Sequence, residues 1–141
     1  MKKNVKIKLL SKQFDGDEKN TIELISEGTY MHKGSKSIIA YEETEATGME
    51  GTRTTIYVHN DRLLTLVREG TVYSKMIIEA GKKHHCQYQT PYGMLNVGVS
   101  AMNIVSSLGD NGGKLDFSYV IDVDSSYVGD FRISLDVKPV N

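Results

Sequence analysis

The sequence predicts an all-β fold, and three observations predict it. Long stretches alternate apolar and polar residues with a period of two, which is typical of strands with one buried face. Short turn-forming stretches divide these runs at spacings close to the 8–12 residues expected of barrels and sandwiches. No segment has a convincing helical period. The composition agrees, because 8 tyrosines and 13 glycines stand against 2 prolines.

The first part of the chain contains six of the predicted strands. Val5, Ile7 and Leu9 alternate with lysines, and a polar turn follows at residues 15–20. The phase of the segment at residues 37–44 is ambiguous, because Ile38 and Ile39 are adjacent. The predicted strands of this part are at residues 5–9, 22–30, 37–44, 54–59, 64–66 and 72–78.

A central stretch, residues 84–93, holds two of the four histidines, the one cysteine and one of the two prolines. Its first part alternates like a strand. Thr90-Pro91-Tyr92-Gly93 has proline second and glycine fourth, which favours a type I turn. A kink within one long strand is the alternative, because proline is tolerated at an edge or a bulge.

The last part is the most regular. Strands are predicted at residues 95–101, 115–123 and 127–137, with turns at residues 110–113 and 125–126. Gly98 in mid-strand predicts a bend or a bulge. Short turns favour antiparallel neighbours, and closure into a barrel would remove exposed edges. The alternation alone leaves a two-sheet sandwich open, in either case as a single domain of residues 1–141.

Charge and composition exclude several classes of function. The net charge is −1, so no strong field would attract nucleic acid or an anionic membrane. One cysteine excludes an internal disulfide framework and fits a reducing compartment. The basic start is not followed by an apolar signal-peptide core, and no apolar run approaches transmembrane length. We expect a cytoplasmic protein.

A resemblance covers nearly the whole chain. Its core is Tyr88-x-Thr90-Pro91-Tyr92-Gly93, and supporting pieces are residues 51–55, the Gly112-Gly113 turn and the Leu115-x-Phe117-x-Tyr119 strand. These motifs resemble the YwiB-like family of small bacterial proteins, a domain of unknown function. The resemblance implies an up-and-down, calycin-like or lipocalin-like barrel of about 8–10 strands. It implies no activity, cofactor or catalytic residue, and shape alone does not imply function.

Metal and nucleophile chemistry have weak support in the sequence. His84, His85 and Cys86 are adjacent, but alternate strand residues point to opposite faces, so one ion could reach at most two of them. A catalytic thiol needs a neighbouring base and a depressed pKa, which this position does not provide. The phosphate-loop pattern fails at residues 34–37 because Ser35 separates Gly34 from Lys36. We expect no metal and no cofactor.

The barrel interior is the remaining candidate for a site. Alternation places Tyr30, Arg68, Tyr88, Tyr119 and Tyr127 on the same faces as apolar residues, with Arg53 near a rim. The apolar residues expected to face inward are Val5, Ile22, Ile56, Leu66, Met76, Phe117 and Phe131. An inward arginine is costly unless paired. It would meet Glu42 or Glu43, or it would receive an anionic head group of a ligand.

Three functions follow from these features. The first is a non-enzymatic barrel that binds a small, partly apolar anion, with candidate residues Arg53, Arg68, Tyr88, Tyr119 and His84. The second is a protein-interaction module with a filled barrel, a homodimer included, working through exposed apolar residues such as Ile25, Ile38 and Tyr57. The third, ranked last, is an enzyme that uses His84 or a glutamate as a base.

Overall fold

Ten antiparallel strands form one continuous sheet that curls into a nearly closed barrel. The structure is a computed structural model that describes residues 2–15, 18–45, 50–70, 73–90 and 93–140, with the backbone alone at residues 15, 18 and 88–90. The strands are β1 (Lys3–Asp15), β2 (Glu18–Lys33), β3 (Lys36–Glu42), β4 (Arg53–Val58), β5 (Leu63–Glu69), β6 (Ser74–Glu79), β7 (Lys83–Thr90), β8 (Gly93–Ser106), β9 (Gly113–Val123) and β10 (Ser126–Pro139).

The strand order is that of an up-and-down barrel. Each strand pairs with its neighbours in sequence except at the β6–β7 junction, and β1 also pairs with β10, so the order runs β6-β5-β4-β3-β2-β1-β10-β9-β8-β7. The two ends of this order, β6 and β7, are joined by a tight turn with an isolated bridge between Glu79 and Lys82. The prediction of a single antiparallel barrel is confirmed, and the arrangement is consistent with a calycin-like barrel.

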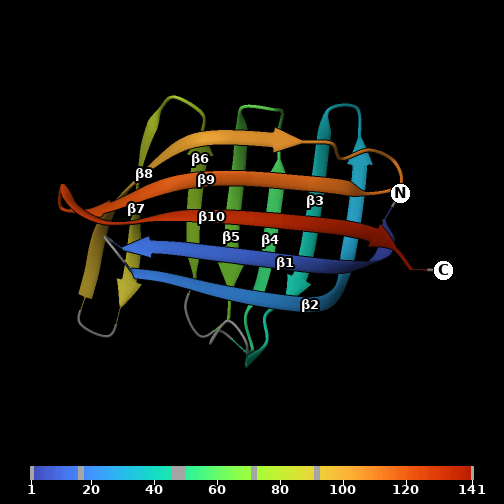
Figure 1. Ribbon diagram of the computed structural model, residues 1–141, viewed down its shortest axis with the longest axis horizontal. Coiled ribbons are helices and arrows are strands. Elements are labelled where there is room, and N and C mark those ends of the chain that lie inside the picture. Colours follow the sequence, from blue (N-terminus) through green and yellow to red (C-terminus); the bar gives the residue numbers. More distant parts are fainter. Residues whose placement is uncertain (1, 16–17, 46–49, 71–72, 91–92, 141) are drawn as a thin grey trace.

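Two layers of strands cross each other, and the long strands β2 and β8 curve from one layer into the other (Figure 1). β2 pairs with β1 along its first part and with β3 along its second part, and the two pairings overlap from Gly28 to Tyr30. A Cβ at Gly28 would overlap the carbonyl oxygen of Ala40. Glycine therefore lets the backbone of β3 approach closely where β2 changes partners.

β8 bends in a similar way. It pairs with β7 through its first residues and with β9 from Val97 onward, and its register against β9 shifts between Ala101 and Asn103. A Cβ at Gly98 would lie 2.5 Å from the Asp122 carboxylate and from the Lys83 side chain. The sequence predicted a bend or bulge at Gly98, and the bulge lies three residues further on.

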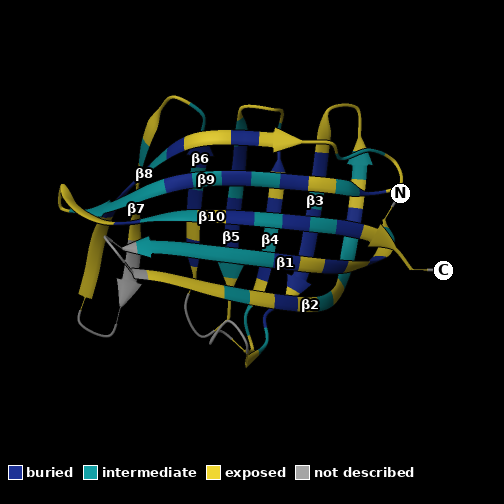
Figure 2. Cartoon of the chain, viewed as in Figure 1, coloured by how far each residue is buried: buried dark blue, intermediate teal, exposed yellow. Residues whose placement is uncertain are grey.

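The core lies between the layers, where alternate residues of most strands are buried (Figure 2). Val5, Ile56, Leu66, Met76 and Phe117 are at most 5% exposed, as predicted. The alternation also continues in β3, where Ser37, Ile39 and Tyr41 are buried, and this resolves the ambiguous phase of that segment. The interior is thus largely filled by side chains.

Two sequence predictions concern the strand ends. β7 and β8 are separate antiparallel strands with Thr90 opposite Gly93, so the chain reverses there, although Pro91 and Tyr92 lie outside the described residues.

Tyr127 was predicted to face inward, and this is wrong, because its side chain is 57% exposed. A bulge between Tyr127 and Gly129 shifts the register of β10 and interrupts the period of two.

Candidate functional site

A row of polar side chains crosses four strands at one end of the barrel's inner face. Tyr41, Thr54, Arg68 and Ser74 are cross-strand partners from β3 to β6. The next row of inward-facing residues, two positions along each strand, is entirely apolar. The same strand pairing aligns Ile39, Ile56, Leu66 and Met76 there. The inner face therefore changes from polar to apolar within one step along the strands.

This polar end contains three buried atoms that have no hydrogen-bond partner among the described residues: Glu43 Oε2, Thr54 Oγ1 and Arg68 Nε. Thr54 is 0% exposed and Glu43 is 5% exposed. Glu43 follows β3 on the same face as Tyr41, and its backbone N–H donates to Thr52 O at 2.8 Å. An unpaired buried polar group costs about 1–3 kcal/mol. Three such groups at one end of the barrel therefore make this end the candidate site.

The opposite end of the same sheet shows that polar residues inside this barrel can be satisfied. The Tyr30 hydroxyl donates to Gly109 O at 2.7 Å and lies 3.4 Å from Ser37 Oγ. The same Ser37 hydroxyl lies 2.8 Å from His32 Nδ1. The polar interior at that end is a closed network, so the unpaired atoms are a local property of the Arg68 end.

Burial and charge act against each other in this cluster. Burial raises the pKa of Glu43 above its usual value, while the positive charge of Arg68 and the nearby Thr54 hydroxyl, which is outside hydrogen-bond geometry, partly oppose the increase. The pKa of Tyr41 is also raised, by burial and then by the charge of Glu43. Arg68 similarly offsets part of the effect of burial on the pKa of Tyr119. Arg68 is thus the shared cation of a group of two tyrosines and one carboxyl.

Tyr119 on β9 is near enough to Arg68 to feel its charge, and it is part of an aromatic cluster. Tyr119 on β9 stacks on Phe131 of β10 with ring centroids 5.3 Å apart, and its ring also lies 6.0 Å from that of Phe117. Tyr119 is 3% exposed, while Phe131 is half-buried. The cluster therefore combines one cation, one carboxyl and several hydroxyls, and Tyr119 connects it to an aromatic group.

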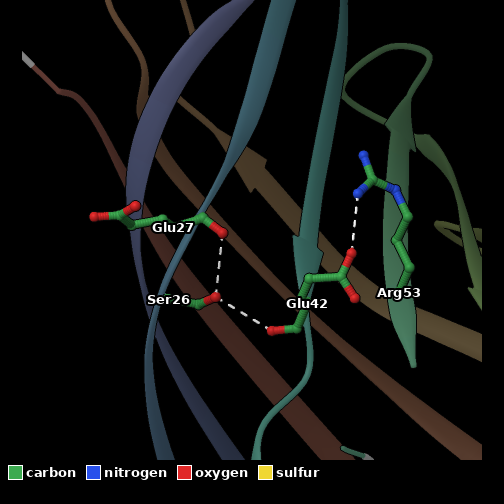
Figure 3. Close-up of polar contacts among 4 residues, drawn as sticks. All are labelled: Ser26, Glu27, Glu42 and Arg53. Carbon is green, nitrogen blue, oxygen red and sulfur yellow. Dashed lines mark hydrogen bonds and ion pairs between the residues drawn. The ribbon is translucent and has the colours of Figure 1, made fainter. Parts of the chain in front are cut away.

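Arg53 does not belong to this cluster. It alternates with Thr54 on β4, so it points to the outer face of the sheet while Thr54 points inward. Its guanidinium donates to Glu42 Oε1 at 3.1 Å, and both side chains are about half-exposed. Figure 3 shows this pair beside Ser26, whose hydroxyl donates to the Glu42 carbonyl oxygen at 3.2 Å. The two candidate arginines are thus separated by the thickness of the sheet.

His84 also lies elsewhere. Its Nε2 is 2.7 Å from Glu79 Oε1, across the turn that joins β6 to β7. This hydrogen bond is the main reason why the pKa of Glu79 is lowered. Glu79 ends β6, whereas Ser74, the partner of Arg68, begins it. The pair is therefore a contact across the seam of the barrel, at the far end of β6 from Arg68.

The other chemical candidates have these positions. Tyr88 lies on β7 with its backbone opposite Leu95, and its side chain is outside the described part of the structure. Cys86 is partly buried, and burial raises the pKa of its thiol, which disfavours the reactive thiolate. Within the described ranges no three His, Cys, Asp or Glu side chains are grouped to hold a metal ion. Nor does any helix in those ranges have the length and apolarity to cross a membrane.

The outer face of β2 to β5 carries a groove of about 320 Å³. Met31, Ile38 and Tyr57 contribute apolar surface to it, and Arg53 and Glu69 are charged residues of its lining. Ile25, the third exposed residue expected of an interaction surface, is 63% exposed and lines a different groove with Lys6 and Lys8. The interaction-module and homodimer predictions stay predictions.

Sequence reasoning placed Arg68 and Tyr119 on inner faces and named Glu43 as a possible partner of an inward arginine. It missed Tyr41, Thr54 and Ser74. Each is an isolated polar residue at an inward position of a short strand, and that signal is present in the sequence. Their common membership of one row depends on strand register, which alternation does not specify.

The fold and the family can now be stated together. The chain is a ten-stranded antiparallel barrel, and residues 7–135 match the family model described as "Domain of unknown function (DUF1934)". The protein belongs to this family. Comparison with curated proteins gives no match.

A solved structure supports the fold independently. The protein is similar to ywiB protein from Bacillus subtilis, whose crystal structure superposes with a TM-score of 0.74 at 20% identity. The match covers 96% of this chain and 92% of the other. The resemblance to YwiB-like proteins that the sequence motifs indicated is confirmed.

Proposed function

We propose that this protein is a non-enzymatic barrel that binds one small, partly apolar anion, with the head group of the ligand at Arg68. The observation that carries the proposal is the gathering of three unpaired buried polar atoms, on Glu43, Thr54 and Arg68, at one end of a barrel interior. Arg68 supplies a positive charge and an unpaired Nε–H donor there, which is the chemistry that recognises a carboxylate or phosphate.

The position of the apolar residues supports a guest with an apolar body. The row next to the polar one is formed by Ile39, Ile56, Leu66 and Met76. Tyr119, which feels the charge of Arg68, stacks on the half-buried Phe131 and offers aromatic surface. Because the apolar residues of that row are at most 5% exposed, the guest lies at the end of the barrel rather than deep in it. Arg53 and His84 take no part in this proposal, since the one is on the outer face and the other at the seam.

The test is native mass spectrometry on the protein purified from the organism that produces it, before and after denaturing extraction. The expected result is a stoichiometric small anion that denaturation releases. The Arg68→Met variant should lose it, and the matched Arg53→Met variant on the neighbouring strand should keep it. A ligand-free wild-type mass, or a ligand retained equally by Arg68→Met, contradicts the proposal. The same spectrum reports whether the protein is a dimer.

A further inference from the structure

Glu43 has a buried carboxyl close to the position proposed for the anion. Its carboxyl is 5% exposed, Oε2 is unpaired, and no described carboxyl–guanidinium ion pair joins it to Arg68. An anion held by Arg68 would therefore place a second negative charge next to a buried carboxyl. Two carboxylates that share one buried site cannot both stay ionised.

We propose that the ligand is a monocarboxylic acid and that it binds with one proton shared between its carboxylate and Glu43. This inference rests on the proposed function. The proton enters from solvent and is held as an O–H that Glu43 donates to the bound carboxylate, or the reverse. Arg68 then compensates the single remaining negative charge, so the filled site is electrically neutral.

The neighbouring charges favour this stoichiometry. The titratable groups around Glu43 are Tyr41 on β3, Arg68 on β5 and Tyr119 on β9. Both tyrosine hydroxyls have raised pKa values and are neutral hydrogen-bond groups. Arg68 is therefore the one cation in this set. A phosphate dianion would need more positive charge than that, whereas a carboxylate sharing a proton with Glu43 needs no more.

The experiment is isothermal titration calorimetry of the full chain with sodium octanoate between pH 5.5 and 8. Sodium octanesulfonate serves as a second probe that cannot take up a proton in this range. For wild type, octanoate affinity should fall about tenfold per pH unit once pH exceeds the pKa of Glu43, since one proton is bound with each ligand. Repeating the titration in buffers of different ionisation enthalpy should give uptake of about one proton.

Two matched variants separate this inference from the binding proposal. Glu43→Gln keeps a hydrogen-bond donor and should bind octanoate with little dependence on pH. Glu42→Gln, which changes the adjacent carboxyl on the outer face, should behave as wild type does. Octanoate binding that needs Arg68 but has the same pH slope in wild type and in Glu43→Gln overturns the shared proton and leaves the binding function standing. Tighter binding of octanesulfonate than of octanoate at pH 5.5 also overturns it. No octanoate binding at any pH overturns both.

Discussion

Thr54 and Arg68 lie directly opposite each other on β4 and β5, and each has a buried polar atom without a hydrogen-bond partner. Cross-strand partners on one face are close neighbours, so their unmet hydrogen-bonding capacity is concentrated in one place. This relationship is the main structural reason to treat the Arg68 end as a site.

The unpaired Thr54 hydroxyl makes a direct prediction about stability. Thr54→Val keeps the shape of the side chain and removes a buried hydroxyl that has no partner. We expect the ligand-free variant to be more stable than wild type by about 1–3 kcal/mol. Urea denaturation measures this difference. The control is Thr55→Val on the outer face, where we expect a change within about 0.5 kcal/mol. A loss of stability in Thr54→Val would contradict this expectation and would mean that the hydroxyl is hydrogen-bonded in the folded protein, with Tyr41 and Glu43 as its nearest polar neighbours.

The pH dependence of stability tests the environment of Glu43. The raised pKa means that the folded protein holds the proton more tightly than the unfolded chain does. This contribution is fully present below the ordinary value of 4.5 and is lost as pH rises through the folded pKa. Each unit of increase corresponds to about 1.4 kcal/mol.

Glu43→Gln should therefore lose less stability than wild type as pH increases above 4.5. Urea midpoints measured at several pH values would show the difference. Glu42→Gln is the matched control, because that carboxylate is exposed and paired with Arg53. If the urea midpoints of wild type and Glu43→Gln depend on pH in the same way, the pKa of Glu43 is not raised.

The contact between His84 and Glu79 at the barrel seam predicts a coupled titration. Because the hydrogen bond from His84 lowers the pKa of Glu79, we expect His84→Ala to return that pKa toward 4.5. A ¹³C NMR titration of the Glu79 carboxyl measures it directly. The sign follows from the lowered pKa: the stability that the contact gives is present above pH 4.5 and is lost as pH falls through the folded pKa. His85→Ala, one residue away on the other face of β7, should leave the Glu79 titration unchanged.

The close approach at Gly28 predicts a strong steric effect. Gly28→Ala would place a methyl group against the Ala40 carbonyl oxygen and 2.9 Å from Ile7 Cδ1, so neighbouring backbone must move. We expect a loss of about 3 kcal/mol, at the upper end of what overpacking costs. Gly109→Ala is the control, because a Cβ there meets nothing within 4 Å. Equal melting temperatures for the two variants would show that β2 can shift without cost.

The residue types alone were enough to predict antiparallel strands and the inward-facing residues of most of them. Arg68 and Tyr119 were among the residues predicted to face inward. Alternation with a period of two follows from strand geometry, so it can be recognised from the residue types alone. The same argument failed at Tyr127, where a bulge interrupts the period.

The alignment of inward-facing residues in one row across neighbouring strands depends on the folded barrel. Register and sheet closure bring Tyr41, Thr54, Arg68 and Ser74 into line and leave Glu43 unpaired beside them. They also place Arg53 on the outer face with Glu42, away from Arg68, with which the sequence analysis had grouped it. Alternation specifies a face but not a position along the neighbouring strand, because the pairing of strands far apart in sequence is set by the packing of the whole barrel.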